Sequence, residues 1–445
     1  MDLGSPLPPH VLILGGGFAG LQAVQGLAKA PVRITLVDRR NYHLFQPLLY
    51  QVATAVLSPE KIAAPLRKIL KKQSNVRVAL AHPQQIDLEE RVVVTPRGVV
   101  PYDYLVLAVG LEQSYFGHDE FRLHAPGMKS LEDAIEVRRR ILLAFEEAEY
   151  ELDEEARRDK LTFVIVGGGP TGVELAGAIR ETATETLPSE FRHVDTATAR
   201  IILIDGGDRL LGGMPEEMGM LAKRDLENMG IEVHLNAHVT AVDTNGAWIG
   251  DTHVPAENVF WAAGVKGTSL AYSLGVDLDR IGRIKVNSDL SIPGDPRAFV
   301  AGDAANIMDP DTRNPVPAVA QGAIQMGNFI AKVISQDIDG VSVEHRPSFH
   351  YKDKGSMAAI GRGKALASIG KVTLGGFIGW VMWGLIHVMF LVGFRTKVVV
   401  MVDWIRNYIG HERGSRLITG DPEMNLKVAR GVILSTEATN ENPDP

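Results

Sequence analysis

The stretch HVLILGGGFAG at residues 10–20 decides the fold, and a counterpart, FVIVGGGPTG, follows at residues 163–172. In each copy a short apolar run precedes three glycines, and a segment with helical spacing of apolar residues follows them. Apolar runs bounded by glycine indicate buried strands, and apolar residues three or four apart indicate helices. The repeat therefore predicts two strand–turn–helix units, 152 residues apart, in a chain of the α/β class.

Glycine turns of this kind let backbone amides approach a pyrophosphate. In the first copy Gly15 allows the tight turn, Gly17 carries no Cβ to block the ligand, and Gly20 lets helix and strand pack closely. The N-terminus of the helix adds partial positive charge. Because the whole pattern occurs twice, we expect two Rossmann-like dinucleotide-binding domains.

Each unit continues into a β-branched strand that ends in an aspartate, Asp38 in the first and Asp205 in the second. A carboxylate here accepts a hydrogen bond from a ribose hydroxyl. At Asp205 it would also repel a 2′-phosphate, which favours NADH over NADPH, while the nearby Arg209 would soften that discrimination. Asp205 stands 33 residues past Gly172, beyond the usual spacing of about 20, so the insertion at 181–198 has to absorb the difference.

Composition removes several classes of function. Acidic residues outnumber basic ones by 54 to 46, which excludes nucleic-acid binding through bulk charge. Cysteine is absent, so thiol chemistry is excluded and any redox chemistry must come from a bound cofactor. His43, His350 and His387 lack the spacing of a metal site, and no export signal is visible in the first thirty residues. We therefore expect a cytoplasmic location and no metal.

Further motifs carry a resemblance to one family. They are DRRNYHLFQPLLYQVAT at 38–54, GVELAG at 172–177, WAAGV at 261–265, AQGAIQ at 320–325 and YKDKGSMA at 351–358. Over about residues 8–415 the chain resembles the type II NADH dehydrogenases, which are single-chain, non-pumping NADH:quinone oxidoreductases. The resemblance implies that the first unit holds FAD without a covalent bond and the second holds NADH. It also implies a membrane quinone, ubiquinone or menaquinone, as acceptor, and a homodimer.

The resemblance assigns roles to particular residues. It implies catalytic roles for Glu174, beside the nicotinamide and flavin, and for Gln321 and Gln325, near the flavin and the quinone. Each role has a structural alternative: stabilisation by the helix dipole for Glu174 and a solvated helix face for the glutamines. Asp303, expected on the ribityl or phosphate part of FAD, has the alternative of a helix N-cap. The predicted cofactor-binding residues are Gly15, Gly16, Gly17, Phe18, Ala19, Gly20, Asp38, Arg39, Gln46, Pro47, Leu48, Ala108, Gly110, Gly302, Asp303, Gln321, Gly167, Gly169, Pro170, Thr171, Gly172, Glu174, Asp205, Ala263 and Gly264.

The predicted domain organisation follows from these motifs. An amphipathic helix at Leu131–Arg158 connects the two units, and a strand at 298–303 rejoins the first sheet. The predicted limits are 8–115 and 286–345 for the FAD-binding domain, 116–160 for the connector, 161–285 for the NADH-binding domain, 346–435 for a C-terminal membrane-association region and 436–445 for a polar tail.

The C-terminal region contains an uncharged stretch, Val372–Phe394, which exceeds the roughly 20 residues of a membrane span. Five glycines, a central His387 and two tryptophans argue against a span. With the amphipathic stretch Val398–Ile409, whose Trp404 and Tyr408 share a face, it predicts two amphipathic helices in the membrane surface. Peripheral attachment to the cytoplasmic face of the inner membrane follows. A buried core or dimer helix is the alternative, and His387 is expected to pack rather than to donate protons.

The predicted function is FAD-dependent NADH:quinone oxidoreduction without proton pumping. Without cysteine the chain cannot be a disulfide reductase or a sulfide:quinone reductase. Two alternatives stay open: a flavoprotein reductase of a soluble protein such as ferredoxin, and a redox-responsive interaction protein that binds FAD and NADH. The apolar C-terminal stretch favours the membrane quinone, since a soluble acceptor would not require it.

Overall fold

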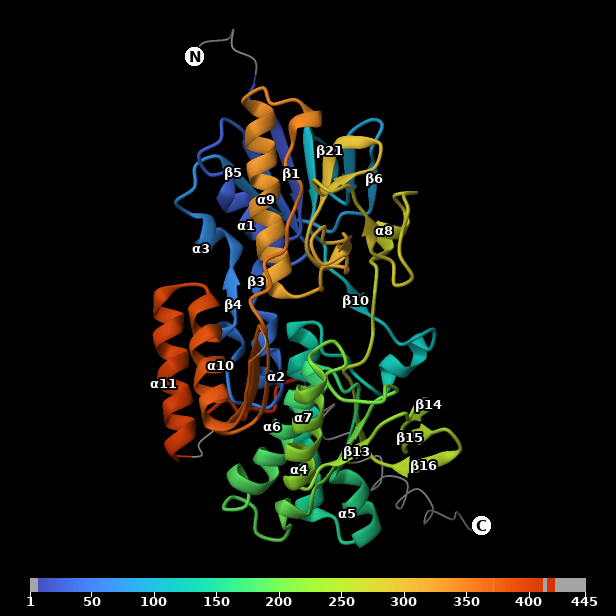
Figure 1. Ribbon diagram of the computed structural model, residues 1–445. Helices are drawn as coiled ribbons and strands as arrows, with labels where there is room; N and C mark the ends of the chain where they lie inside the picture. The colour runs from blue at the N-terminus through green and yellow to red at the C-terminus, as the bar shows by residue number, and fades with distance from the viewer. Residues whose placement is uncertain (1–6, 371, 411–413, 421–445) are drawn as a thin grey trace, which may run out of the picture.

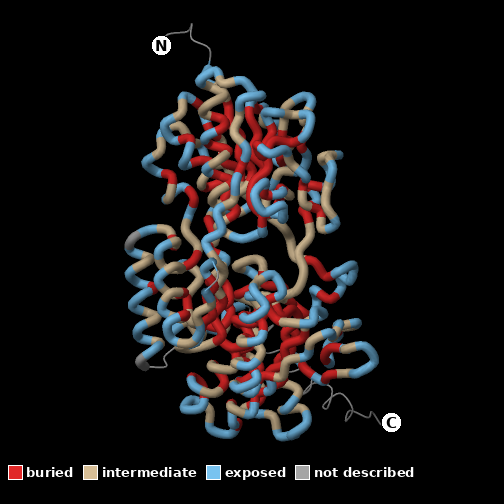
Figure 2. The backbone as a smooth tube through the Cα atoms, in the orientation of Figure 1, coloured by how far each residue is buried: buried red, intermediate tan, exposed pale blue. Residues whose placement is uncertain are grey.

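Two α/β lobes and a C-terminal pair of helices make up the computed structural model, which describes residues 7–370, 372–410 and 414–420. The lobes lie one above the other, and the helices α10 and α11 stand along one side (Figure 1). Buried residues concentrate in the centre of each lobe (Figure 2). The polar tail expected at 436–445 lies outside the described residues.

The first lobe is built on a six-stranded sheet in the order β20-β21-β9-β1-β2-β5. Its strands are β1 (His10–Leu14), β2 (Arg33–Asp38), β5 (Val76–Leu80), β9 (Tyr104–Leu107), β20 (Ser291–Ile292) and β21 (Asp295–Val300). All neighbours are parallel except β20 and β21. The pairing of Ala298 with Leu105 confirms that the chain returns to the first sheet after building the second lobe.

The second lobe repeats this plan with a four-stranded parallel sheet in the order β13-β12-β11-β17. Its strands are β11 (Thr162–Val166), β12 (Arg200–Ile204), β13 (Glu232–His234) and β17 (Asn258–Trp261). An antiparallel sheet of β14 (Val239–Asp243), β15 (Gly246–Ile249) and β16 (Thr252–Pro255) flanks it. The predicted α/β class is thus confirmed.

Helices begin directly at both glycine turns, α1 (Phe18–Gly26) in the first lobe and α6 (Pro170–Glu181) in the second. In the first lobe α9 (Ala320–Ile338) packs against α1 at very short range. A Cβ added to Gly327 would lie 2.2 Å from the carbonyl oxygen of Ala19, so this approach requires glycine. The small residues of α9 therefore serve close packing of helix on helix.

The connector differs from the expectation of one helix at Leu131–Arg158. It consists of α4 (Leu131–Tyr150) and α5 (Glu154–Lys160), with extended backbone between them. The expected single helix is interrupted at Asp153, because the carboxylate of this residue caps α5. It accepts hydrogen bonds from the amides of Glu155 at 2.8 Å and Ala156 at 2.9 Å.

The C-terminal region begins with an antiparallel sheet of β23 (Ser356–Gly361), β24 (Lys364–Ile369) and β25 (Val372–Leu374). The helices α10 (Gly376–Phe390) and α11 (Phe394–Gly410) follow. The expectation that the uncharged stretch is helical from its start is wrong for Val372–Leu374, because these residues pair with β24. Within the described ranges no helix has the length and apolar character needed to cross a membrane.

Candidate functional site

The two glycine turns have the same atomic geometry. Gly15 and Gly167 both adopt a left-handed backbone, with φ of +105° and +115°. A Cβ on Gly20 would lie 1.8 Å from the carbonyl oxygen of Gly15, and one on Gly172 would lie 1.8 Å from that of Gly167. Each pair thus requires glycine for the turn and for the contact between helix and turn.

The two aspartates take equivalent places beside these turns. One carboxylate oxygen of Asp38 accepts a hydrogen bond from the amide of Gly16, and one of Asp205 accepts from that of Gly168, both at 2.5 Å. The long spacing before Asp205 is absorbed as expected, because residues 182–199 leave the helix α6 through a π-helical turn (η4, Thr182–Thr186) and return to β12. The guanidinium of Arg209 donates to the carbonyl of Gly212 at 3.0 Å.

Both turns open onto a single cavity of about 1700 Å³ between the lobes. Pockets for a drug-sized ligand measure about 300–1,000 Å³, so this one has room for more than one ligand. The predicted residues that line it are Gly15, Gly16, Gly17, Phe18, Ala19, Asp38, Arg39, Gln46, Pro47, Ala108, Gly110, Gly169, Pro170, Thr171, Glu174, Gly302, Asp303 and Gln321.

The remaining predicted residues lie outside the lining of this cavity. Gly20, Gly167 and Gly172 form the turns beneath it, and Leu48 is fully buried in the core. Asp205 borders a shallower pocket beside the second turn, together with Gly168, Gly169 and Arg209. The carbonyls of Ala263 and Gly264 accept hydrogen bonds from the Gln113 side chain at 2.5 and 2.9 Å.

The residues present fit two dinucleotides. Gly17 and Gly169 stand at the N-caps of α1 and α6, and a Cβ added to either would meet no atom within 4 Å. Each turn therefore presents open space in front of a helix N-terminus, where backbone amides and the helix dipole favour a pyrophosphate.

Asp303 lies in the short 3-10 helix η6 (Gly302–Ala304), which follows β21, and lines the cavity. Burial raises the pKa of its carboxyl, and the charge of Lys129 opposes that rise. Burial in turn lowers the pKa of Lys129, which Asp303 opposes. Sequence reasoning missed Lys129; the available signal was its place directly before Ser130, the N-cap of α4, where the chain passes between the lobes.

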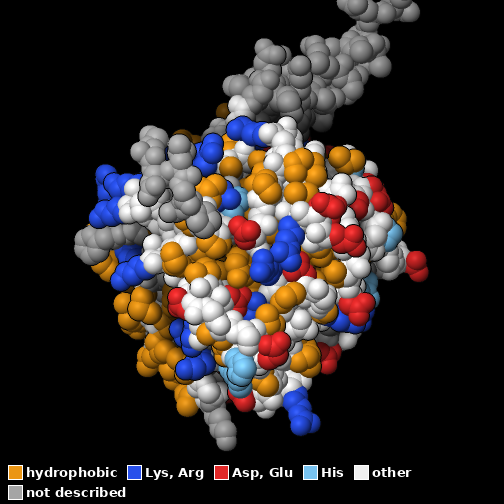
Figure 3. Space-filling model, turned by 90° about the horizontal axis from the view of Figure 1, so that it is seen from above, with side chains coloured by type: hydrophobic (Ala, Val, Ile, Leu, Met, Phe, Trp, Pro, Cys, Tyr) orange, Lys and Arg blue, Asp and Glu red, His pale blue; other side chains and the backbone are white. Residues whose placement is uncertain are grey.

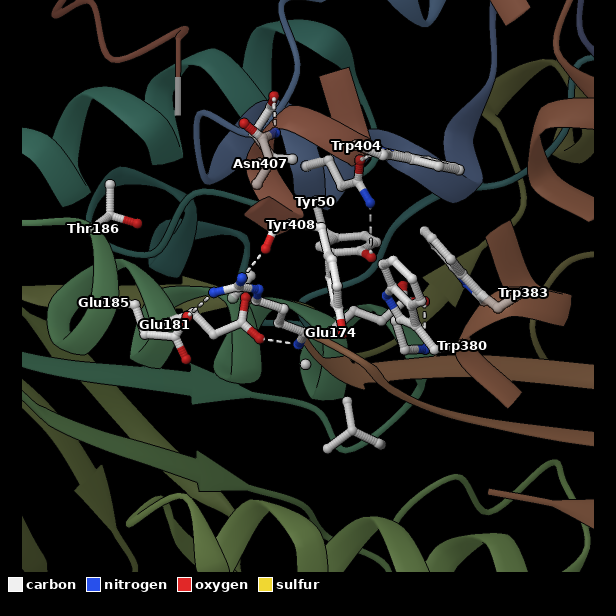
Figure 4. Close-up of a pocket in the computed structure, with 17 residues that line it drawn as sticks. Tyr50, Glu174, Glu181, Glu185, Thr186, Trp380, Trp383, Trp404, Asn407 and Tyr408 are labelled. Carbon is white, nitrogen blue, oxygen red and sulfur yellow. Dashed lines mark hydrogen bonds and ion pairs between the residues drawn. The ribbon is translucent and has the colours of Figure 1, made fainter. Parts of the chain in front are cut away.

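Glu174 lies on α6, at the boundary between the large cavity and a second one of about 100 Å³ (Figure 4). Its carboxylate accepts a hydrogen bond from the amide of Ala359 at 3.2 Å. Burial nevertheless dominates and raises the pKa of Glu174 to about 8, so the carboxyl is largely protonated at neutral pH. Tyr50 lines both cavities as well, and sequence reasoning gave it no role of its own.

The two glutamines of α9 have different surroundings. Gln321 lines the large cavity, and its buried amide oxygen has no hydrogen-bond partner in the described part of the chain. Gln325 instead joins α9 to the irregular segment before β23: its side-chain nitrogen donates to the carbonyl of Lys352 and its side-chain oxygen accepts from the backbone amide of Lys352, each at 3.0 Å. The structure therefore brings Gln321, but not Gln325, into the lining of the cavity.

His387 is on α10, which forms one end of the large cavity, and it lines the cavity there. Its Nδ1 donates to the carbonyl of Trp383 at 2.7 Å, and its ring meets Phe45 edge-on. Burial lowers the pKa of His387 to about 4, so the imidazole is neutral at physiological pH. In the ranges that the structure covers, no group of acidic and histidine side chains has the arrangement of a metal site.

Comparisons with known proteins agree with this arrangement. Residues 9–327 match the family described as pyridine nucleotide-disulphide oxidoreductase, and residues 353–411 match the NDH2 C-terminal domain. The type II NADH:quinone oxidoreductase Ndh of Mycobacterium tuberculosis is 44% identical over 427 residues, which cover 93% of this chain and 91% of that protein. The chain belongs to the type II NADH:quinone oxidoreductases. The resemblance and the reaction class expected from the sequence are thereby confirmed.

Other type II NADH:quinone oxidoreductases extend the comparison. The Staphylococcus aureus protein is 31% identical over 79% of this chain and 87% of its own length. The structure of NDH2 from Plasmodium falciparum in complex with NADH superposes with a TM-score of 0.83, covering 93% of this chain and all of that one. At 20% identity this last similarity shows the shared fold alone.

Proposed function

We propose that FAD occupies the part of the large cavity bordered by the first glycine turn and NADH the part bordered by the second. The single observation that carries this assignment is that two turns of closely similar geometry open onto one cavity. When bound, the flavin supplies the redox chemistry, accepting a hydride from NADH and giving two electrons to a quinone. The chain binds, orients and shields these partners.

In the proposed site, residues of the first lobe contact both the adenosine end and the ring end of FAD. The amides behind Gly16 and Gly17 hold the pyrophosphate, and Asp38 accepts from a ribose hydroxyl. Gln46 and Pro47 border the ring, and Asp303 lies toward the ribityl or phosphate part of FAD, where its carboxylate can accept from a ribityl hydroxyl. Lys129, opposite Asp303, adds a positive charge to the same region.

On the nicotinamide side, Asp205 accepts from the adenosine ribose and disfavours a 2′-phosphate. Arg209 does not cancel this preference, because its guanidinium is turned toward the carbonyl of Gly212. NADH is therefore the preferred reductant.

At the quinone end, Glu174 holds a proton at its carboxyl below about pH 8 and can deliver it when the quinone is reduced. Gln321 carries an amide in the cavity that can donate to a quinone carbonyl. Gln325 does not line the cavity but positions residues that do. Its two hydrogen bonds to Lys352 fix the backbone between Tyr351 and Asp353, which both line the cavity.

The membrane-facing surface is formed by α10 and α11. Apolar side chains stand exposed on both helices: Phe377, Ile378, Val381, Leu385, Met389, Val398, Val399, Met401, Val402 and Ile405. Hydrophobic side chains gather at the left edge of Figure 3, the side on which these helices lie in Figure 1. Large apolar patches of this kind mark surfaces that bind lipid or protein.

We assign this face to the cytoplasmic surface of the inner membrane, from which a lipid-soluble ubiquinone or menaquinone reaches the cavity beside α10. Ile386, His387 and Phe390 of that helix line the cavity. His387 serves there as a neutral packing residue. The homodimer expected from the family resemblance stays a prediction.

Anaerobic spectroscopy of the purified protein tests this function. A bound flavin gives a visible absorption band that NADH bleaches and a quinone restores. A flavin that NADH reduces but quinone fails to reoxidise would contradict the quinone assignment, and a protein that binds no flavin would contradict the cavity assignment.

A further inference from the structure

Polar contacts dock the helix α11 onto the wall of the small cavity that borders Tyr50 and Glu174. Trp404 donates its indole N–H to the side-chain oxygen of Gln51 at 2.8 Å. One position earlier on the helix, Asp403 forms an ion pair with Lys61, and one turn later Asn407 reaches the carbonyl of Val56 at 3.5 Å. Positions 403, 404 and 407 lie on one helical face, opposite the exposed apolar residues Val402 and Ile405.

Gln51 connects Trp404 to Tyr50, which lines the large cavity. It is buried on α2 (Leu49–Ala53), 6% exposed, and its amide nitrogen donates to the Tyr50 hydroxyl at 3.1 Å. Both ends of the Gln51 amide are therefore engaged, one by α11 and the other by Tyr50. Tyr50, like Glu174, lines both the large cavity and the small one, so this chain of hydrogen bonds ends at the boundary between them (Figure 4).

A tyrosine hydroxyl that accepts a hydrogen bond keeps its own hydrogen to donate in another direction. Fixing the acceptor side of Tyr50 therefore also restricts where that hydrogen points. Trp404 itself is held in place by its ring, which packs 5.2 Å from the ring of the buried Trp383. The orientation of the Tyr50 hydroxyl thus depends on a helix 353 positions away in the chain from Gln51.

We propose that Gln51 and Trp404 are positioning residues for quinone reduction: they orient the Tyr50 hydroxyl at the cavity wall and link its placement to the docking of α11. The inference rests on the proposed function, in which quinone enters beside the C-terminal helices. Reduction of the flavin by NADH should not depend on these residues, because Gln51 and Trp404 line the small cavity and not the large one in which NADH is placed.

The variants Trp404→Phe and Gln51→Leu test the inference. Phenylalanine keeps an aromatic ring at 404 but leaves the buried oxygen of Gln51 without its donor. We expect kcat/KM for a short-chain, water-soluble quinone to fall about tenfold, the order of magnitude for one unsatisfied buried group. The KM for NADH and the rate of flavin reduction in single turnover should change less than about twofold.

Two controls separate positioning from a general structural effect. Trp380→Phe alters a tryptophan of the same small cavity, whose ring centroid lies 5.0 Å from that of Tyr408, and should keep quinone kinetics unchanged. The double variant of Gln51 and Trp404 should be no worse than Gln51→Leu alone, because both changes break the same chain of contacts.

Several outcomes overturn the inference. One is a fall in kcat/KM that is equal for NADH and for quinone, and another is a fall in kcat/KM for quinone that is additive in the double variant. A fall for Trp380→Phe as large as that for Trp404→Phe, or release of the Trp404→Phe protein from lipid vesicles, would also overturn it. If the unaltered protein fails to reduce quinone while its flavin is reduced by NADH, the proposed function fails instead, so the two failures are distinguishable.

Discussion

A single carboxyl at the site, that of Glu174, has a pKa far above its usual value. It is the fifth residue of α6, just past the first turn, near the helix end where the dipole favours a negative charge, yet burial raises its pKa to about 8. The dipole alone therefore does not account for this side chain. A protonated carboxyl at the wall of the cavity is suited to supply one of the two protons that a quinone takes up on reduction.

Glu174→Gln keeps the size of the side chain but removes the exchangeable proton. We expect quinone-dependent reoxidation of the flavin to slow by about 100-fold, within the range for loss of a general acid. In the unaltered protein this step should also slow as the pH rises through about 8, where the carboxyl ionises, and the variant should lack that dependence. Stopped-flow mixing of reduced protein with quinone from pH 6 to 9 measures both effects.

The same burial affects stability. The folded protein retains a proton on Glu174 that the unfolded chain loses near pH 4.5, so the free energy of unfolding should fall as the pH rises from 4.5 to about 8. Glu174→Gln should remove this loss and be more stable than the unaltered protein at pH 8, by a few kcal/mol at most. Urea unfolding at pH 5 and pH 8 provides the comparison; equal pH dependence of the two proteins would refute it.

Asp205 determines the choice of nicotinamide cofactor in the proposed site. The two carboxylate oxygens of Asp205 accept from the amides of Gly168 and Gly207, and Asp205→Asn keeps an acceptor for only one of these amides and removes the charge. We expect the KM for NADH to rise about tenfold and the preference over NADPH to shrink, because a charge-assisted hydrogen bond to ribose and the repulsion of a 2′-phosphate are both lost. Steady-state kinetics with both nucleotides decides this, with an unchanged quinone KM as the internal control.

At the scale of elements, the C-terminal helices each have two distinct faces. Trp383 of α10 is 2% exposed and packs in the core, whereas Ile378 and Leu385 of the same helix are each 63% exposed. Trp404 and Tyr408 share a face, as the sequence predicts, but that face contacts the protein: Trp404 meets Gln51, and the ring of Tyr408 packs against that of Trp380. The opposite faces carry the exposed apolar side chains that we assign to lipid.

The double variant Ile378→Glu and Leu385→Glu should release the protein from membranes. Burying a large apolar side chain contributes about 1.5–3 kcal/mol, so replacing two with charges should weaken vesicle binding on the order of 100-fold or more. Leu152→Glu is the matched control, since Leu152 is 91% exposed between α4 and α5. Flotation with vesicles measures binding, and a variant that still floats like the control would contradict the membrane assignment.

At the scale of the whole molecule, the two glycine turns belong to different lobes and face one cavity, and we assign one dinucleotide to each turn. Gly17 and Gly169 are equivalent positions at which an added Cβ meets no protein atom within 4 Å. Valine at either position is therefore compatible with the local packing, but its side chain enters the space assigned to a pyrophosphate.

Gly17→Val should abolish the flavin absorption band, whereas Gly169→Val should keep the band and raise the KM for NADH about tenfold or more. Each variant is the control for the other. Absorption spectra of the purified proteins and steady-state kinetics test the pair. Loss of flavin in both variants, or in neither, would contradict the assignment of one dinucleotide to each lobe.

The sequence by itself determined those features that depend on local chemistry. Only glycine adopts the positive φ of Gly15 and Gly167 without strain, so the two turns and the helices behind them were readable from residue types and spacing. The strands that end in Asp38 and Asp205 followed in the same way. The family resemblance then supplied the reaction class.

Tertiary structure decided everything that depends on which neighbour a residue meets. Val372–Leu374 is a strand because β24 lies beside it, and the amide of Gln325 is turned to Lys352 although its spacing from Gln321 is that of one helical face. Lys129 and Tyr50 belong to the site because the tertiary fold places both in the lining of the cavity. Burial and long-range hydrogen bonds are set by segments far apart in the chain, and local spacing carries no information about them.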